Sequence, residues 1–130
     1  MTMKMLLTVT AIVEAGAGVA LLGLPSVTAS LLLGAALGTS AAVILARVGG
    51  AAILALSIVC WLTRDAQEFA ARGLVIAMVF YNLAVAGVLA FAGFSDSLFG
   101  MLLWPAVAFH VAMGAWCFAT LSRNHEGALP

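Results

Sequence analysis

Charged residues are scarce in this chain. Five Lys or Arg and five Asp or Glu make up 8% of its 130 residues, and the formal net charge is zero. A soluble globular domain carries about 25% charged residues. No basic patch is available to bind nucleic acid, so nucleic acid is excluded as an expected partner. Disorder is excluded as well, because it requires low hydrophobicity and high net charge.

Hydrophobic residues are correspondingly abundant. They form 65% of the chain, and the mean hydropathy is +1.24. This composition predicts an integral membrane protein, with the lipid bilayer as its first partner. The alternating segments of about ten residues that are typical of β-barrel strands do not occur. We therefore predict a single all-α membrane domain over residues 1–130.

A membrane-spanning helix needs roughly 20 mostly apolar residues. The stretches that meet this condition predict a four-transmembrane-helix bundle with spans at about 5–24, 40–62, 73–92 and 98–121. Residues 26–38 predict an entry loop or a short interfacial helix. A cleaved signal peptide is the alternative for the first span, since Val27-Thr28-Ala29 resembles a cleavage site. Glu14, near the middle of the apolar stretch, favours a span that is retained.

The basic residues flank the predicted spans on one side only. The loops 25–39 and 93–97 contain no Lys or Arg, and the cations beside the spans are Lys4, Arg64, Arg72 and Arg123. By the positive-inside rule, both termini and the 63–72 loop are expected to be cytoplasmic. This arrangement is typical of a multi-pass protein of a bacterial-type inner (cytoplasmic) membrane.

Cysteine and histidine are also few, with two residues each. Cys60 and Cys117 lie near the cytoplasmic ends of their spans, where thiols stay reduced. No C-x-x-C motif, metal-ligand cluster, phosphate-binding glycine loop or activated nucleophile occurs, so neither an enzyme nor a cofactor is indicated. The alternative is a haem or a pigment bound through His110, where a methionine would be the second haem ligand.

Each predicted span contains one strongly polar residue: Glu14, Arg47, Asn82 or His110. A charge at the bilayer centre costs roughly 2.5–3.5 kcal/mol, so such residues normally face the protein interior and pair. With a rise of 1.5 Å per residue, all four lie roughly 10–18 Å below the outer ends of their spans. We predict that Glu14 pairs with Arg47, and that Asn82 and His110 close a hydrogen-bonded ring near Tyr81.

This polar layer has two interpretations. In the first, Glu14 carries a charge or accepts a proton, Arg47 is its counter-ion, and the other three residues orient a proton-coupled or amphiphilic small ligand. In the second, the layer fixes helix register in an accessory or assembly subunit of a larger membrane complex. A homo-oligomer also remains open.

Small and polar residues recur at three- and four-residue steps along one face of the second span, from Arg47 through Gly50 to Ser57. Gly18 and Gly114 continue this pattern on the first and fourth spans. Because small residues let membrane helices approach closely, they predict a packing seam inside the bundle.

Residues 45–64, LARVGGAAILALSIVCWLTR, contain a glycine pair and end in a small polar residue followed by Arg. This segment resembles the glycine-pair helix of the DoxX-like group of small four-helix membrane proteins. The resemblance implies a four-helix bundle and a membrane accessory role, often in redox or stress systems. It implies no catalytic residue.

Overall fold

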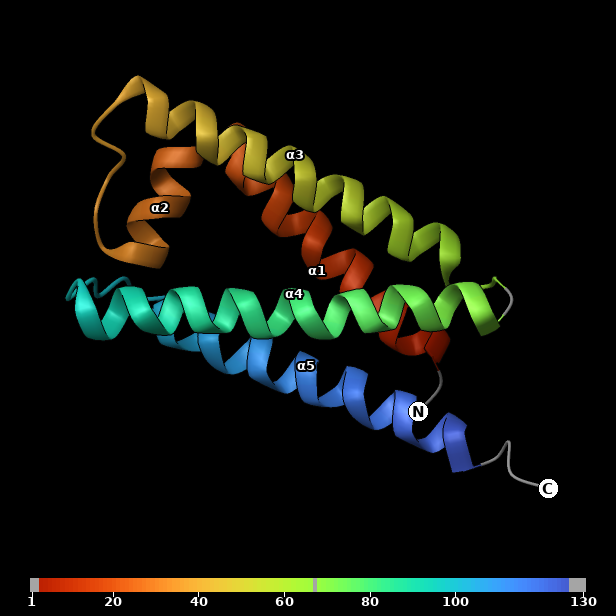
Figure 1. Cartoon of the computed structure of the whole chain (residues 1–130). Helices are drawn as coiled ribbons and strands as arrows, with labels where there is room; N and C mark the ends of the chain where they lie inside the picture. Colours follow the sequence, from red (N-terminus) through yellow and green to blue (C-terminus); the bar gives the residue numbers. More distant parts are fainter. Residues whose placement is uncertain (1–2, 67, 127–130) are drawn as a thin grey trace.

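The computed structural model describes residues 3–66 and 68–126, which form five α-helices (Figure 1). These are α1 (Met3–Gly23), α2 (Pro25–Leu33), α3 (Ser40–Thr63), α4 (Glu68–Ser95) and α5 (Leu103–Glu126). All of them except α2 are long and apolar enough to span a bilayer. Large apolar side chains such as Leu45, Phe80 and Phe94 are exposed on their outer faces, as in a protein surrounded by lipid.

The first two predicted spans agree with α1 and α3 to within two residues, whereas α4 begins at Glu68, five residues before the predicted 73. Helix α2 covers Pro25–Leu33, where an entry loop or a short interfacial helix over 26–38 was expected. The fourth span differs, because α5 begins at Leu103 rather than near residue 98. The preceding segment is held by α2 instead of continuing a helix: the backbone N–H of Leu102 donates to the carbonyl oxygen of Leu31 over 2.8 Å. Apolar composition alone does not reveal this contact between two distant segments.

The long helices are arranged as two pairs, with α1 packed along α3 and α4 along α5 (Figure 1). At Gly18 and Gly50 the backbones of α1 and α3 are in close contact. A Cβ atom on Gly50 would lie 2.8 Å from the backbone nitrogen of Leu22 and 2.9 Å from the carbonyl oxygen of Gly18. Ser57 adds a bond across the same pair, since its Oγ donates to the carbonyl oxygen of Ala11 over 2.7 Å. The predicted packing seam is therefore present at Gly18, Gly50 and Ser57, but Arg47, where it was expected to begin, is exposed.

The two pairs meet in a hydrophobic core near the start of α1. This core includes Leu6, Leu7, Ala11, Cys60, Ala71, Val75, Met78, Met113 and Cys117. At the opposite end α2 lies between the pairs and contacts α1, α3 and α5. Gly34 ends α2 in the left-handed conformation, with φ 75°, and a side chain at Gly100 would collide with the backbone of Leu32. The space between the helix pairs is therefore filled by the side chains of the hydrophobic core at one end and by α2 at the other.

Three charged residues, Lys4, Arg64 and Asp65, lie together at the core end. Lys4 Nζ lies 2.6 Å from Asp65 Oδ1, and the guanidinium of Arg64 stacks 3.6 Å from the ring centroid of Trp61. The hydrogen bond from Lys4, together with the charges of Lys4 and Arg64, holds the pKa of Asp65 below its ordinary value. The start of α1 and the turn after α3 therefore lie at the same end of the molecule.

Candidate functional site

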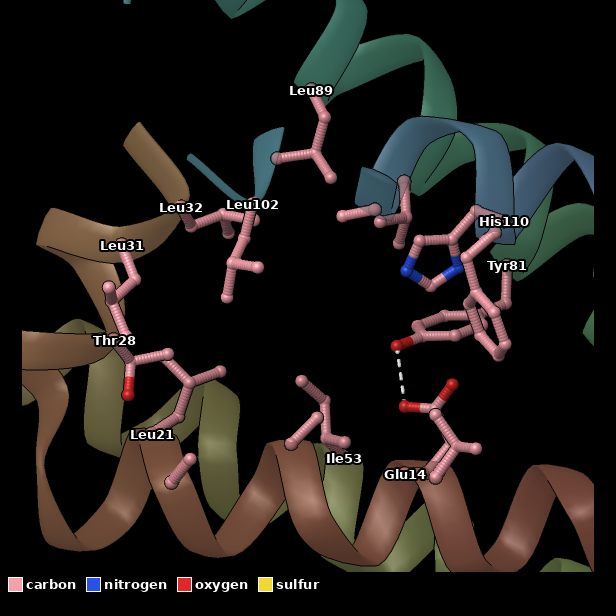
Figure 2. Close-up of a pocket in the computed structure, with 16 residues that line it drawn as sticks. Glu14, Leu21, Thr28, Leu31, Leu32, Ile53, Tyr81, Leu89, Leu102 and His110 are labelled. Atoms are coloured by element: carbon pink, nitrogen blue, oxygen red, sulfur yellow. Dashed lines mark hydrogen bonds between the residues drawn. The ribbon is translucent and has the colours of Figure 1, made fainter. Parts of the chain in front are cut away.

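A pocket of about 470 Å³ lies between the two helix pairs and extends to α2 (Figure 2). Its volume falls within the range of about 300–1,000 Å³ that is usual for small-molecule sites. The polar lining residues are Glu14, Thr28, Tyr81 and His110, and the apolar ones are Val13, Ala17, Ala20, Leu21, Leu31, Leu32, Ile53, Val85, Leu89, Leu102, Ala106 and Phe109. Figure 2 shows Glu14, Tyr81 and His110 together at one end, with the leucines of α2 at the other. The pocket is therefore amphipathic along its length.

Glu14 reaches the pocket because it lies on the buried face of α1. Leu7, Ala11, Glu14 and Gly18 recur at three- and four-residue steps and are all buried. The Glu14 side chain is only 3% exposed. Its Oε2 accepts a hydrogen bond of 2.9 Å from the Tyr81 hydroxyl on α4 (Figure 2). This bond joins the two helix pairs at the middle of α1.

His110 is hydrogen-bonded to Asn82. The Nδ1 of His110 lies 2.9 Å from Asn82 Oδ1, while Asn82 Nδ2 donates to the carbonyl oxygen of Met78 over 2.8 Å. Since the amide oxygen of Asn82 can only accept, Nδ1 of His110 must carry the proton. In the neutral ring, Nε2 is then an acceptor. Because His110 lines the pocket, this arrangement presents a basic nitrogen to a ligand.

Tyr81 connects the two hydrogen-bonded pairs. Its ring lies edge-on to the ring of His110, with 5.8 Å between centroids, while its hydroxyl reaches Glu14. Phe109 contacts His110 in the same way at 5.7 Å. Instead of the predicted closed ring, the polar side chains form two hydrogen-bonded pairs, Tyr81 with Glu14 and His110 with Asn82. The two pairs contact each other through the side-chain rings of Tyr81 and His110.

The predicted ion pair between Glu14 and Arg47 is wrong. The side chain of Arg47 is exposed on α3, and neither ion pair found among the described residues includes it. The reason is the register between α1 and α3. Gly18 faces Gly50 and Ala11 faces Ser57, which places Glu14 opposite Leu54. Arg47 lies two helical turns away from that position, or about 10 Å along the axis.

The other residues that could carry chemistry lie away from this pocket. Cys60 and Cys117 are free thiols within the hydrophobic core, together with Met78 and Met113. In the part of the chain that the structure describes, no three His, Cys, Asp or Glu side chains gather to hold a metal ion. No protein-family model matches the chain, and no curated protein or solved structure matches it.

The Tyr81→Phe variant isolates the bond between the helix pairs, because it removes one oxygen and keeps the ring. We expect the free energy of unfolding to fall by about 0.6 kcal/mol, the average for hydrogen bonds between membrane helices, and by no more than about 1.7 kcal/mol, the largest such value. Reversible unfolding in mixed micelles gives this value. The control is Ser122→Ala, which removes an exposed hydroxyl that bonds within its own helix to Phe118. Equal stability of the two variants would contradict a contribution from the Tyr81–Glu14 bond.

Proposed function

We propose that this chain is a multi-pass protein of a bacterial-type inner membrane and that it binds an amphiphilic small molecule. The observation that carries the proposal is the pocket between the helix pairs, with an apolar wall and polar groups at one end. Apolar walls with a few placed polar groups are the usual form of small-molecule sites. The apolar body of the ligand would lie against Leu31, Leu32 and Leu102, and its polar group beside Glu14, Tyr81 and His110.

In the proposed arrangement the four long helices form one bundle in the bilayer, with both termini cytoplasmic. The cations support this orientation. Lys4 lies in the first turn of α1, and Arg64 directly follows α3. Arg72 lies in the second turn of α4, and Arg123 lies in the last turns of α5. Antiparallel helices bring these four positions to one end, and the positive-inside rule assigns that end to the cytoplasm.

Binding can be tested by filling the pocket. Ala106 lines the pocket from α5, so Ala106→Phe would occupy the space of a ligand, whereas the exposed Ala108 lies outside the lining. The probe is decanol carrying a diazirine in its chain, photolysed in phosphatidylcholine nanodiscs that contain the protein. We expect saturable labelling of pocket residues in the wild type and in Ala108→Phe, competed by excess decanol. Ala106→Phe is expected to lose this saturable component.

The non-saturable labelling of lipid-facing residues serves as the internal reference. If Ala106→Phe and Ala108→Phe are labelled alike, or if excess decanol competes with no labelling in the wild type, the binding proposal is wrong. Unchanged elution of both variants on size exclusion shows that the comparison is made on folded protein.

A second candidate, a subunit of a larger membrane assembly, is favoured by the position of Arg47. Charged residues within membrane spans almost always face the protein interior or pair, yet Arg47 is exposed on α3 about 10 Å from its first residue. A partner helix carrying a carboxylate would supply the missing charge, in line with the accessory role of DoxX-like proteins. Native mass spectrometry should then show a complex that Arg47→Leu dissociates. A wild-type protein that is monomeric and free of partners would contradict this candidate.

A further inference from the structure

Among the described residues, Glu14 is the only acidic one in the pocket lining, and none of them in that lining is a Lys or an Arg. The cations of the described chain lie elsewhere. Lys4 pairs with Asp65, Arg64 stacks on Trp61, and Arg47 is exposed on α3. A buried carboxylate without a counter-ion is costly in an apolar environment. A positive charge on the ligand would offset that cost, whereas a negative one would add to it.

The hydrogen-bonding groups of the lining point to the same kind of ligand. Each side-chain donor is already used: Tyr81 donates to Glu14, Thr28 donates to the carbonyl oxygen of Leu24, and Nδ1 of His110 donates to Asn82. The groups that remain are acceptors. They include Nε2 of the neutral His110 ring and Oε1 of Glu14, to which no described residue donates, and the hydroxyl oxygens of Tyr81 and Thr28 can accept as well. The polar end of the pocket therefore favours a ligand group that donates hydrogen bonds.

Aromatic rings add to this preference. Tyr81 and Phe109 both contact His110 edge-on, with centroid distances of 5.8 and 5.7 Å, so three neighbouring rings belong to the pocket lining. Cations within about 6 Å of an aromatic face are attracted by the quadrupole of the ring. Neutral and anionic head groups gain nothing comparable from these rings.

We propose that the ligand is a lipophilic amine bound in its protonated form, an inference that rests on the proposed function. The ammonium group donates to Oε1 of Glu14 and to Nε2 of His110, and its positive charge balances the carboxylate. The apolar part runs along the pocket toward Leu31, Leu32 and Leu102. Fatty acids and other anionic amphiphiles are excluded from the site, because they bring a second negative charge and no donor that would stabilise it.

The experiment uses competitors that differ only in the head group. Decylamine, decanol and decanoate compete with the decanol photoprobe at pH 7 in nanodiscs of zwitterionic phosphatidylcholine, with partitioning corrected on empty nanodiscs. We expect decylamine to compete at a concentration about tenfold or more below that of decanol, because charge-assisted hydrogen bonds are roughly twice as strong as neutral ones. Decanoate is expected to be the weakest of the three.

Two variants that each remove one negative charge show which residue causes the preference for the amine. Glu14→Gln removes the carboxylate and should bring decylamine and decanol to similar concentrations, while its saturable labelling shows that the pocket is intact. Asp96→Asn removes one negative charge at an exposed position outside the lining and should keep the wild-type preference. Should Glu14→Gln not fold, the order of the three competitors on the wild type decides alone.

The outcomes separate the two proposals. If labelling is saturable but decanol or decanoate competes as well as decylamine, the pocket binds amphiphiles and the amine proposal is overturned. An amine preference that persists in Glu14→Gln or disappears in Asp96→Asn also overturns it, because the charge would then act from outside the pocket. Labelling that no competitor reduces contradicts the proposed function itself.

Discussion

Replacement of Gly50 by alanine is expected to lower the free energy of unfolding by about 1–3 kcal/mol, the usual cost of overpacking. The added Cβ would meet the backbone nitrogen of Leu22 at 2.8 Å and the carbonyl oxygen of Gly18 at 2.9 Å. Both atoms belong to the backbone of α1, so no side-chain rotation can make room. The helices α1 and α3 must move apart, and the contacts beside the crossing weaken with them.

The neighbouring Gly49 provides the matched control. A Cβ atom at Gly49 meets nothing within 4 Å. Gly49→Ala should therefore leave stability unchanged or raise it by up to about 1 kcal/mol through helix propensity. Unfolding of both variants in mixed micelles gives the comparison. If Gly50→Ala is as stable as Gly49→Ala, the close contact between α1 and α3 does not exist in the protein.

Gly18 offers an independent check of the same crossing. Its Cβ would lie 2.9 Å from the carbonyl oxygen of Gly50, so Gly18→Ala strains the contact from the other side. Once one substitution has separated the helices, the second costs less. The double variant should therefore be more stable than the sum of the single effects predicts, as expected for residues that share a contact.

The long helices were predictable because hydropathy is a local property. About 20 apolar residues in sequence suffice to indicate a span, whatever lies beside them. The start of α5 was not predictable in this way. Residues 98–102 are as apolar as a helix requires, but they are held by the backbone contact between Leu102 and Leu31. That contact depends on where α2 lies, which only the packing of the helix pairs determines.

The polar residues of the site were predictable for a different reason. Glu14, Asn82 and His110 stand out in apolar spans, and burial in lipid leaves such residues few places except the protein interior. Their partners depend on register. The sequence allows Glu14 and Arg47 at similar depth, yet the Gly18–Gly50 crossing shifts Arg47 by two turns and leaves Tyr81 as the partner of Glu14.

The apolar wall of the pocket had no sequence signal. Phe109, Leu31 and Leu102 resemble every other apolar residue of the chain, and only their position between two diverging helix pairs makes them line a cavity. The sequence also does not show which hydrogen-bond donors are free to bind a ligand. The hydroxyl groups of Thr28 and Tyr81 already donate to Leu24 and Glu14, and this follows from backbone geometry and helix spacing, not from residue type. The chemistry of the ligand is therefore readable only from the assembled site.

Loss of the Asn82 side chain is expected to affect both stability and the state of His110. Asn82 is 1% exposed and accepts the Nδ1 proton of His110. Asn82→Leu keeps a similar volume but leaves Nδ1 of His110 without a hydrogen-bond partner, at a cost of about 1–3 kcal/mol. Combining it with His110→Phe removes both polar groups, so the double variant should be more stable than the sum of the two single losses predicts.

The ring of His110 gives a second measurement that a merely structural role of Asn82 would not change. In the wild type, Asn82 fixes the neutral tautomer with the proton on Nδ1, since its own amide nitrogen is bound to the carbonyl oxygen of Met78. Nitrogen-15 NMR distinguishes the protonated ring nitrogen from the bare one, and a His125→Gln background leaves His110 as the only histidine. Asn82→Leu should release the proton to Nε2, replacing the acceptor that faces the pocket with a donor. A wild-type spectrum with the proton on Nε2 would contradict the assignment, and with it the acceptor that we assign to the amine.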